Sequence, residues 1–101
     1  MKIEIETADY KLASDFDNQT EIPGGAIIAS KSEMIRRMEV DSHLIELIIT
    51  FSGGVSTSLI ANWIYDKLKG RASRIRINRK EVNFNKGQIE KILIEEIEKE
   101  K

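Results

Sequence analysis

The sequence contains no cysteine, one histidine (His43) and one proline (Pro23) among its 101 residues. Without cysteine there is no disulfide bond, no thiolate nucleophile and no zinc site that needs thiolate ligands. The single histidine has Asp41 and Glu46 nearby, which are too few ligands for a metal site, and no catalytic triad is indicated beyond sequence neighbours. The sequence therefore predicts a protein that is not an enzyme and that uses no metal and no cofactor.

A large net charge of either sign is also missing. The chain has 16 Lys and Arg residues against 17 Asp and Glu residues, a net charge of −1, and 41% of its residues are hydrophobic. Such a composition supports a folded core, and this length predicts one domain over residues 1–101. The first residues alternate Ile with Glu and form no apolar run of the kind found in signal peptides, so we expect a cytoplasmic protein.

The first half of the chain shows mainly strand signals. Ile3 and Ile5 alternate with charged residues, which predicts a strand over residues 2–7. Residues 8–21 have no sustained period and predict a loop or a weak helical turn. Pro23-Gly24-Gly25 then separates this segment from a strand over residues 26–30. Residues 34–40 fit either a second strand that pairs with it or a short helix, and we favour the strand.

The longest apolar segment lies between residues 44 and 69. Asp41 and Ser42 are good helix N-caps, the apolar residues that follow are spaced by three or four, and Gly70 is a natural stop. This spacing predicts one long helix, rich in small residues, that packs against a sheet and pairs with another helix or with a second copy of the chain. The glycine pair Gly53-Gly54 opposes this prediction, because each glycine inside a helix costs about 1 kcal/mol relative to alanine. Whether residues 44–51 are helix or strand stays open.

The end of the chain predicts a hairpin and a closing helix. Alternating apolar residues in 74–77 and 82–84 flank Asn78-Arg79-Lys80, and Asn85 with Gln88 forms a capping box ahead of an amphipathic stretch. We therefore expect an α+β domain with a small mixed sheet, one long apolar helix, a β-hairpin and a C-terminal amphipathic helix.

A second interpretation of the long segment makes residues 44–51 a buried parallel strand that leads through Ser52-Gly53-Gly54 into a helix. Such a turn presents free amides to a phosphate. With Thr57-Ser58, this stretch resembles the SGG-x-DS signature of the PP-loop ATP pyrophosphatases, a resemblance that implies an ATP site built from Ser52, Gly53, Gly54, Thr57 and Ser58. The chain departs from that pattern at Ser56, where the family carries aspartate, and only 31 residues follow Gly70 for the remaining strands of such a domain.

A third interpretation makes residues 44–65 a single membrane span. The segment is long enough at about 1.5 Å per residue to cross roughly 30 Å of hydrocarbon. Gly54, Ser58 and Asn62 stand four apart, the spacing that lets helices pack closely in lipid. Glu46 and Asn62 oppose this interpretation, because inserting a carboxylate or an amide into lipid is unfavourable.

The second half of the chain also resembles a family of small prokaryotic domains. The resemblance lies in residues 62–71, which contain Trp63 followed by Lys67, in the short strand of residues 75–78, and in the amphipathic stretch of residues 89–97. This order is similar to the effector-associated constant components, adaptor-like proteins of bacterial conflict systems, and it covers residues 44–98. It implies a non-catalytic partner domain and transfers no site residue.

Seven cations lie between residues 67 and 80 with no acidic residue among them. On a hairpin, Arg74 and Arg76 share one face, away from Ile75 and Ile77, where an acidic partner could meet them. Nucleic acid is disfavoured, because the chain has a pI near 5.9 and no aromatic residue interleaves with these cations. We therefore predict a protein-binding adaptor or inhibitor that contacts another protein through Trp63, Arg74 and Arg76, with a homodimer through the 44–69 helix as a further predicted form.

Overall fold

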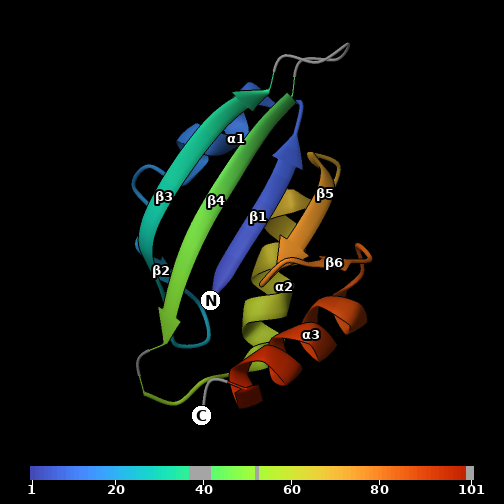
Figure 1. Ribbon diagram of the computed structural model, residues 1–101. Coiled ribbons are helices and arrows are strands. Elements are labelled where there is room, and N and C mark those ends of the chain that lie inside the picture. The colour runs from blue at the N-terminus through green and yellow to red at the C-terminus, as the bar shows by residue number, and fades with distance from the viewer. Residues whose placement is uncertain (37–41, 52, 100–101) are drawn as a thin grey trace.

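The computed structural model describes residues 1–36, 42–51 and 53–99 (Figure 1). The elements of this part of the chain are β1 (Lys2–Thr7), α1 (Tyr10–Asp15), β2 (Glu21–Ile22), β3 (Ala26–Arg36), β4 (Ser42–Phe51), α2 (Thr57–Leu68), β5 (Ala72–Ile77), β6 (Lys80–Val82) and α3 (Lys86–Lys99). The α+β class is confirmed, together with the hairpin (β5 and β6) and the C-terminal helix (α3).

The strands form one sheet in the order β2-β3-β4-β1-β5-β6, and every neighbouring pair is antiparallel. The first strand lies at the centre, between β4 and β5. Because β4 and β5 both run antiparallel to β1, they are parallel to each other, and parallel strands need a long crossover between them. Helix α2 provides this crossover.

The alternation in β1 sets the two faces of the sheet. Ile3 and Ile5 are buried on the inner face beside Ile45 and Leu47, as a period of two requires. Helices α1 and α2 cover this inner face, and α3 packs beside α2 and next to β6 (Figure 1). The outer face carries the charged residues of β1 and has no described helix on it.

The predicted single helix over residues 44–69 is wrong in its first part. Residues 44–51 belong to β4, and the helix covers only Thr57–Leu68. Strand β4 has a neighbour on each side in the sheet, and its inner-facing Ile45, Leu47 and Ile49 are buried while Leu44 on the other face is buried too. A strand with apolar residues on both faces shows no clean alternation, so helix-like spacings arise by chance.

This correction also removes the predicted membrane span over residues 44–65, since that segment is a strand, a loop and a helix. Within the described ranges, no helix is both long and apolar enough to cross a membrane. Ser42 begins β4 and therefore caps no helix, and Asp41 lies outside the described residues. The second strand expected over residues 34–40 is wrong as far as Arg36, because β3 continues to that residue, and residues 37–40 are outside the described part.

The hairpin between β5 and β6 turns through Asn78 and Arg79. Their φ angles are 48° and 71°, which is the geometry of a two-residue type I′ turn. Asn78 tolerates this left-handed backbone better than most residues. Its amide side chain also accepts a hydrogen bond from the backbone of Lys2 at 2.9 Å and donates one to Glu96 at 3.1 Å. The turn therefore joins the first strand to the last helix.

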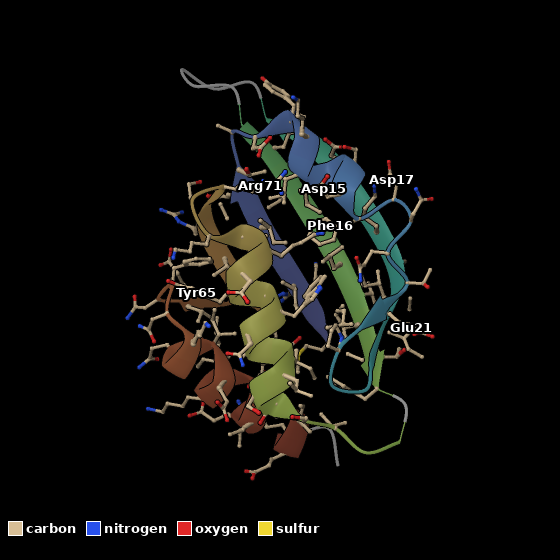
Figure 2. The ribbon with its side chains drawn as sticks, turned by 180° about the vertical axis from the view of Figure 1, so that it is seen from behind. Asp15, Phe16, Asp17, Glu21, Tyr65 and Arg71 are labelled. Carbon is tan, nitrogen blue, oxygen red and sulfur yellow. The ribbon has the colours of Figure 1, made fainter. Side chains whose placement is uncertain are left out.

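Arg71 holds the short helix α1 in place. Its guanidinium donates to Asp9, the N-cap of α1, at 2.7 Å and to Asp15, the last residue of α1, at 2.6 Å. Figure 2 shows Arg71 and Asp15 side by side. These hydrogen bonds lower the pKa of Asp9 and raise that of Arg71. Arg71 therefore has a structural role, although in the sequence it belongs to the basic run, the seven cations of residues 67–80.

Gly24 fixes the turn before β3 against the start of α2. Its φ is +104°, its carbonyl accepts from the Ser56 amide at 2.9 Å, and a Cβ there would lie 2.7 Å from the Ser56 carbonyl oxygen and 2.8 Å from the Ile60 side chain. An added methyl group must therefore strain the backbone or displace the helix.

We expect Gly24→Ala to lower the free energy of unfolding by roughly 2–4 kcal/mol, measured by urea denaturation. Gly54→Ala is the matched control, because a Cβ at Gly54 meets nothing within 4 Å and its φ is not in the left-handed region. The control should change stability by less than about 0.5 kcal/mol. Equal effects of the two substitutions would contradict the proposed docking of the turn on α2.

Candidate binding groove

A groove of about 360 Å³ lies between the loop that follows β4 and the second half of α3. Its lining residues are Gly53, Val55, Thr57, Ile94, Ile97 and Glu98. In Figure 1 the loop and the start of α2 lie beside the C-terminal end of α3. Val55 is 37% exposed and Ile94 is 40% exposed, so apolar side chains on both walls face solvent. We refer to these six residues as the groove.

Local sequence signals build both walls. The Ser56 hydroxyl accepts from the Leu59 amide and begins α2, and Asn85 accepts from the Gln88 amide at 2.8 Å and begins α3. The Asn85 cap confirms that part of the predicted capping box. On α3, Ile89 and Leu93 face the core, which leaves Ile94 on the exposed side of the same helix.

Glu96 anchors the α3 wall to the hairpin. Its side chain is only 7% exposed and lies 3.2 Å from the Lys80 ammonium and 3.1 Å from that of Lys99. The hydrogen bond from Asn78 and the contacts with these two lysines lower the pKa of Glu96 to about 2. Glu96 is thus a buried charged residue on the core side of an amphipathic helix.

The residues predicted to hold a phosphate lie partly in the groove. Gly53 and Thr57 line it, Gly54 and Ser58 are exposed beside it, and Ser52 lies outside the described residues. The strand, loop and helix of the second interpretation are present, but β4 is antiparallel to both of its neighbours. The wall opposite the loop consists of two isoleucines and a carboxylate, and the lining contains no cation. A nucleotide phosphate is usually held by lysine or arginine in addition to backbone amides, so this lining disfavours an ATP site.

Arg74 and Arg76 lie on the outer face of β5, away from the groove. Arg74 contacts Glu81 at 2.8 Å and Glu6 at 3.7 Å, and Arg76 lies 3.9 Å from both Glu4 and Glu6. The acidic residues of β1 and β6 therefore balance these cations within the chain, as pairs of opposite charge across neighbouring strands do. The role of Arg74 and Arg76 in contacting a partner protein stays a prediction from the sequence.

Trp63 is half-buried on α2 and packs against the core, with its ring 6.0 Å from that of Phe16. Figure 2 shows Phe16 on the side of the sheet that α2 covers. Trp63 therefore contributes to the packing of α1 on α2, and the structure brings it near neither Arg74 nor the groove residues. The three predicted interaction residues form no single surface.

His43 is buried on the inner face of β4, where its Nδ1 atom contacts Glu33 on β3 and its ring meets Tyr10 edge-on at 4.2 Å. The predicted neighbours of His43 differ from those observed, because Glu46 points to the opposite face and pairs with Lys2 at 3.4 Å. Among the described residues, no group of three or more His, Asp or Glu side chains is placed to hold a metal ion.

Sequence reasoning missed Val55, Ile94 and Glu98. The spacing of apolar residues within 44–69 does not separate Val55 from the residues that are buried, and nothing in the sequence sets Glu98 apart from the other glutamates of α3. Ile94 directly follows the buried Leu93, so it lies outside the buried stripe of α3. An apolar residue outside the buried stripe of an amphipathic helix is the sequence signal that could have indicated this site.

Comparison with protein-family models, with curated proteins and with solved structures finds no match to this chain. The resemblances to the effector-associated constant components and to the PP-loop ATP pyrophosphatases therefore stay predictions from the sequence.

The low pKa of Glu96 predicts a specific loss of stability in acid. The folded state holds this carboxylate with a pKa of about 2, below the usual glutamate value of 4.5, so the unfolded chain takes up the proton first as the pH falls. The stabilisation is complete above about pH 4.5 and is lost between about pH 4.5 and 2. We expect Glu96→Gln to reduce the fall in melting temperature between pH 7 and pH 3 relative to the unchanged protein. An identical fall in both proteins would contradict the anchoring of α3 by this group.

The charge of the groove predicts that MgATP does not bind there. Millimolar MgATP should leave the melting temperature unchanged, because a bound ligand would raise it by mass action. A rise that disappears in Gly54→Ala would instead support the ATP site implied by the PP-loop resemblance.

Proposed function

We propose that this chain is a non-catalytic protein-interaction domain and that the groove receives a segment of a partner protein. The observation that carries this proposal is the exposure of Val55 and Ile94, two apolar side chains that line the same concave surface. Solvent-exposed apolar side chains in a concave surface of a folded domain are typical of recognition sites.

The scaffold supports this role in two ways. Gly24 packs the turn before β3 against the start of α2, and Glu96 connects α3 to the β5–β6 hairpin. Both walls of the groove are therefore connected to the sheet. A site held in this way loses little conformational entropy when a partner binds. The resemblance of residues 44–98 to adaptor-like prokaryotic domains agrees with such a role, and a place in a bacterial conflict system is part of the proposal.

The test is photo-crosslinking from defined positions. A benzoylphenylalanine at position 94 should crosslink one protein in an extract of the native host, whereas the same residue at position 62 should not, because Asn62 is exposed on α2 and does not line the groove. The captured protein is then purified and its affinity measured by calorimetry.

We expect Val55→Asp to weaken this affinity by about tenfold or more, because a charge would be covered by apolar groups on binding. Asn62→Asp adds the same charge at an exposed position of α2 and should leave the affinity unchanged. Equal crosslinking from both positions, or an unaffected Val55→Asp variant, would count against the groove as the binding site.

A further inference from the structure

The groove has one charged lining residue, and that residue has no ion-pair partner in the described part of the chain. Glu98 lies at the rim beside Ile94 and Ile97. The neighbouring carboxylates of α3 differ, because Glu95 lies 3.9 Å from the Lys80 ammonium and Glu96 contacts both Lys80 and Lys99. Glu98 is therefore a negative charge that the described fold leaves uncompensated.

This charge constrains what the groove accepts. An apolar occupant that covers Ile94 and Ile97 also removes water from the adjacent Glu98 carboxylate, and removing water from an unpaired charge is costly. An occupant with a cation next to its apolar side chains avoids that cost and gains a charge-assisted contact. An acidic or phosphorylated segment would meet repulsion.

We infer that the groove recognises a short basic, apolar segment of a protein partner, in which one or two aliphatic side chains lie next to a lysine or an arginine. This inference rests on the proposed function and specifies its partner. The volume of about 360 Å³ is at the low end of the range for ligand sites, which suits a few side chains and not a whole helix.

The test uses three synthetic hexapeptides, acetylated and amidated, each with two central leucines and with flanking residues that are all lysine, all glutamine or all glutamate. Binding is followed by NMR on the methyl groups of Val55, Ile94 and Ile97. The lysine peptide should shift these methyl groups and bind about three- to fivefold more tightly than the glutamine peptide, with the glutamate peptide weakest. Added salt should reduce the preference.

The matched variants are Glu98→Gln and Glu90→Gln, which remove one carboxylate each from the same helix, although only Glu98 lines the groove. Glu98→Gln should abolish the preference for lysine and leave the affinity for the glutamine peptide within about twofold, whereas Glu90→Gln should retain the preference. Equal affinity for all three peptides, or a preference that survives Glu98→Gln, overturns the inference.

The outcomes separate this inference from the function on which it rests. If none of the peptides binds but position 94 still crosslinks a partner, the assigned chemistry is wrong and the interaction domain stands. If both fail, the groove is not a protein-binding site. Light scattering that shows a dimer, lost in Ile94→Asp, would identify a second copy of the chain as the occupant and overturn the inference.

Discussion

The central position of β1 is the constraint on which the rest of the structure depends. This strand pairs with β4 on one side and with β5 on the other, so it joins the meander of β2, β3 and β4 to the unit formed by α2, the hairpin and α3. The pairing of β1 with β4 extends to Met1, because the Met1 carbonyl accepts a hydrogen bond from the Ile49 amide at 2.7 Å. With β1 between them, β4 and β5 run parallel, and α2 must cross the inner face to connect them. The loop that enters α2, and with it one wall of the groove, is a result of this connection.

Strands with one solvent-exposed face could be predicted from the sequence, whereas strand β4, which has buried residues on both faces, could not. In β1, charges alternate with Ile3 and Ile5, and in the hairpin Arg74 and Arg76 alternate with isoleucines, so the period of two is visible. Strand β4 has buried residues on both faces, and its run of apolar side chains fits helix and strand alike. The glycine pair after it was the better guide, because the local cost of Gly53-Gly54 disappears when these residues form a loop.

The groove could not be predicted because its walls are about forty residues apart in the sequence. Periodicity assigns each side chain to a face of its own helix, but it does not say which helices lie next to each other. The basic run shows the opposite case. Its residues are close in sequence, yet four of its seven cations, Arg71, Arg74, Arg76 and Lys80, form ion pairs with acidic residues of the same chain. Much of a strong local charge signal is therefore balanced within the fold. Balanced composition was the earlier indication of this outcome.

Asn78 connects the first strand to the last helix, so both elements depend on its hydrogen bonds. Its backbone amide donates to the Lys2 carbonyl at 2.8 Å, its side chain accepts from the Lys2 amide, and the same side chain donates to Glu96 on α3. Unwinding of the last helix would release Glu96 and free the Asn78 side chain, which also holds the first strand. Amide hydrogen exchange at Lys2 would then report on motions of α3, although Lys2 and Glu96 lie at opposite ends of the chain. Such a result would mean that the C-terminal helix and the central strand open together as one cooperative unit.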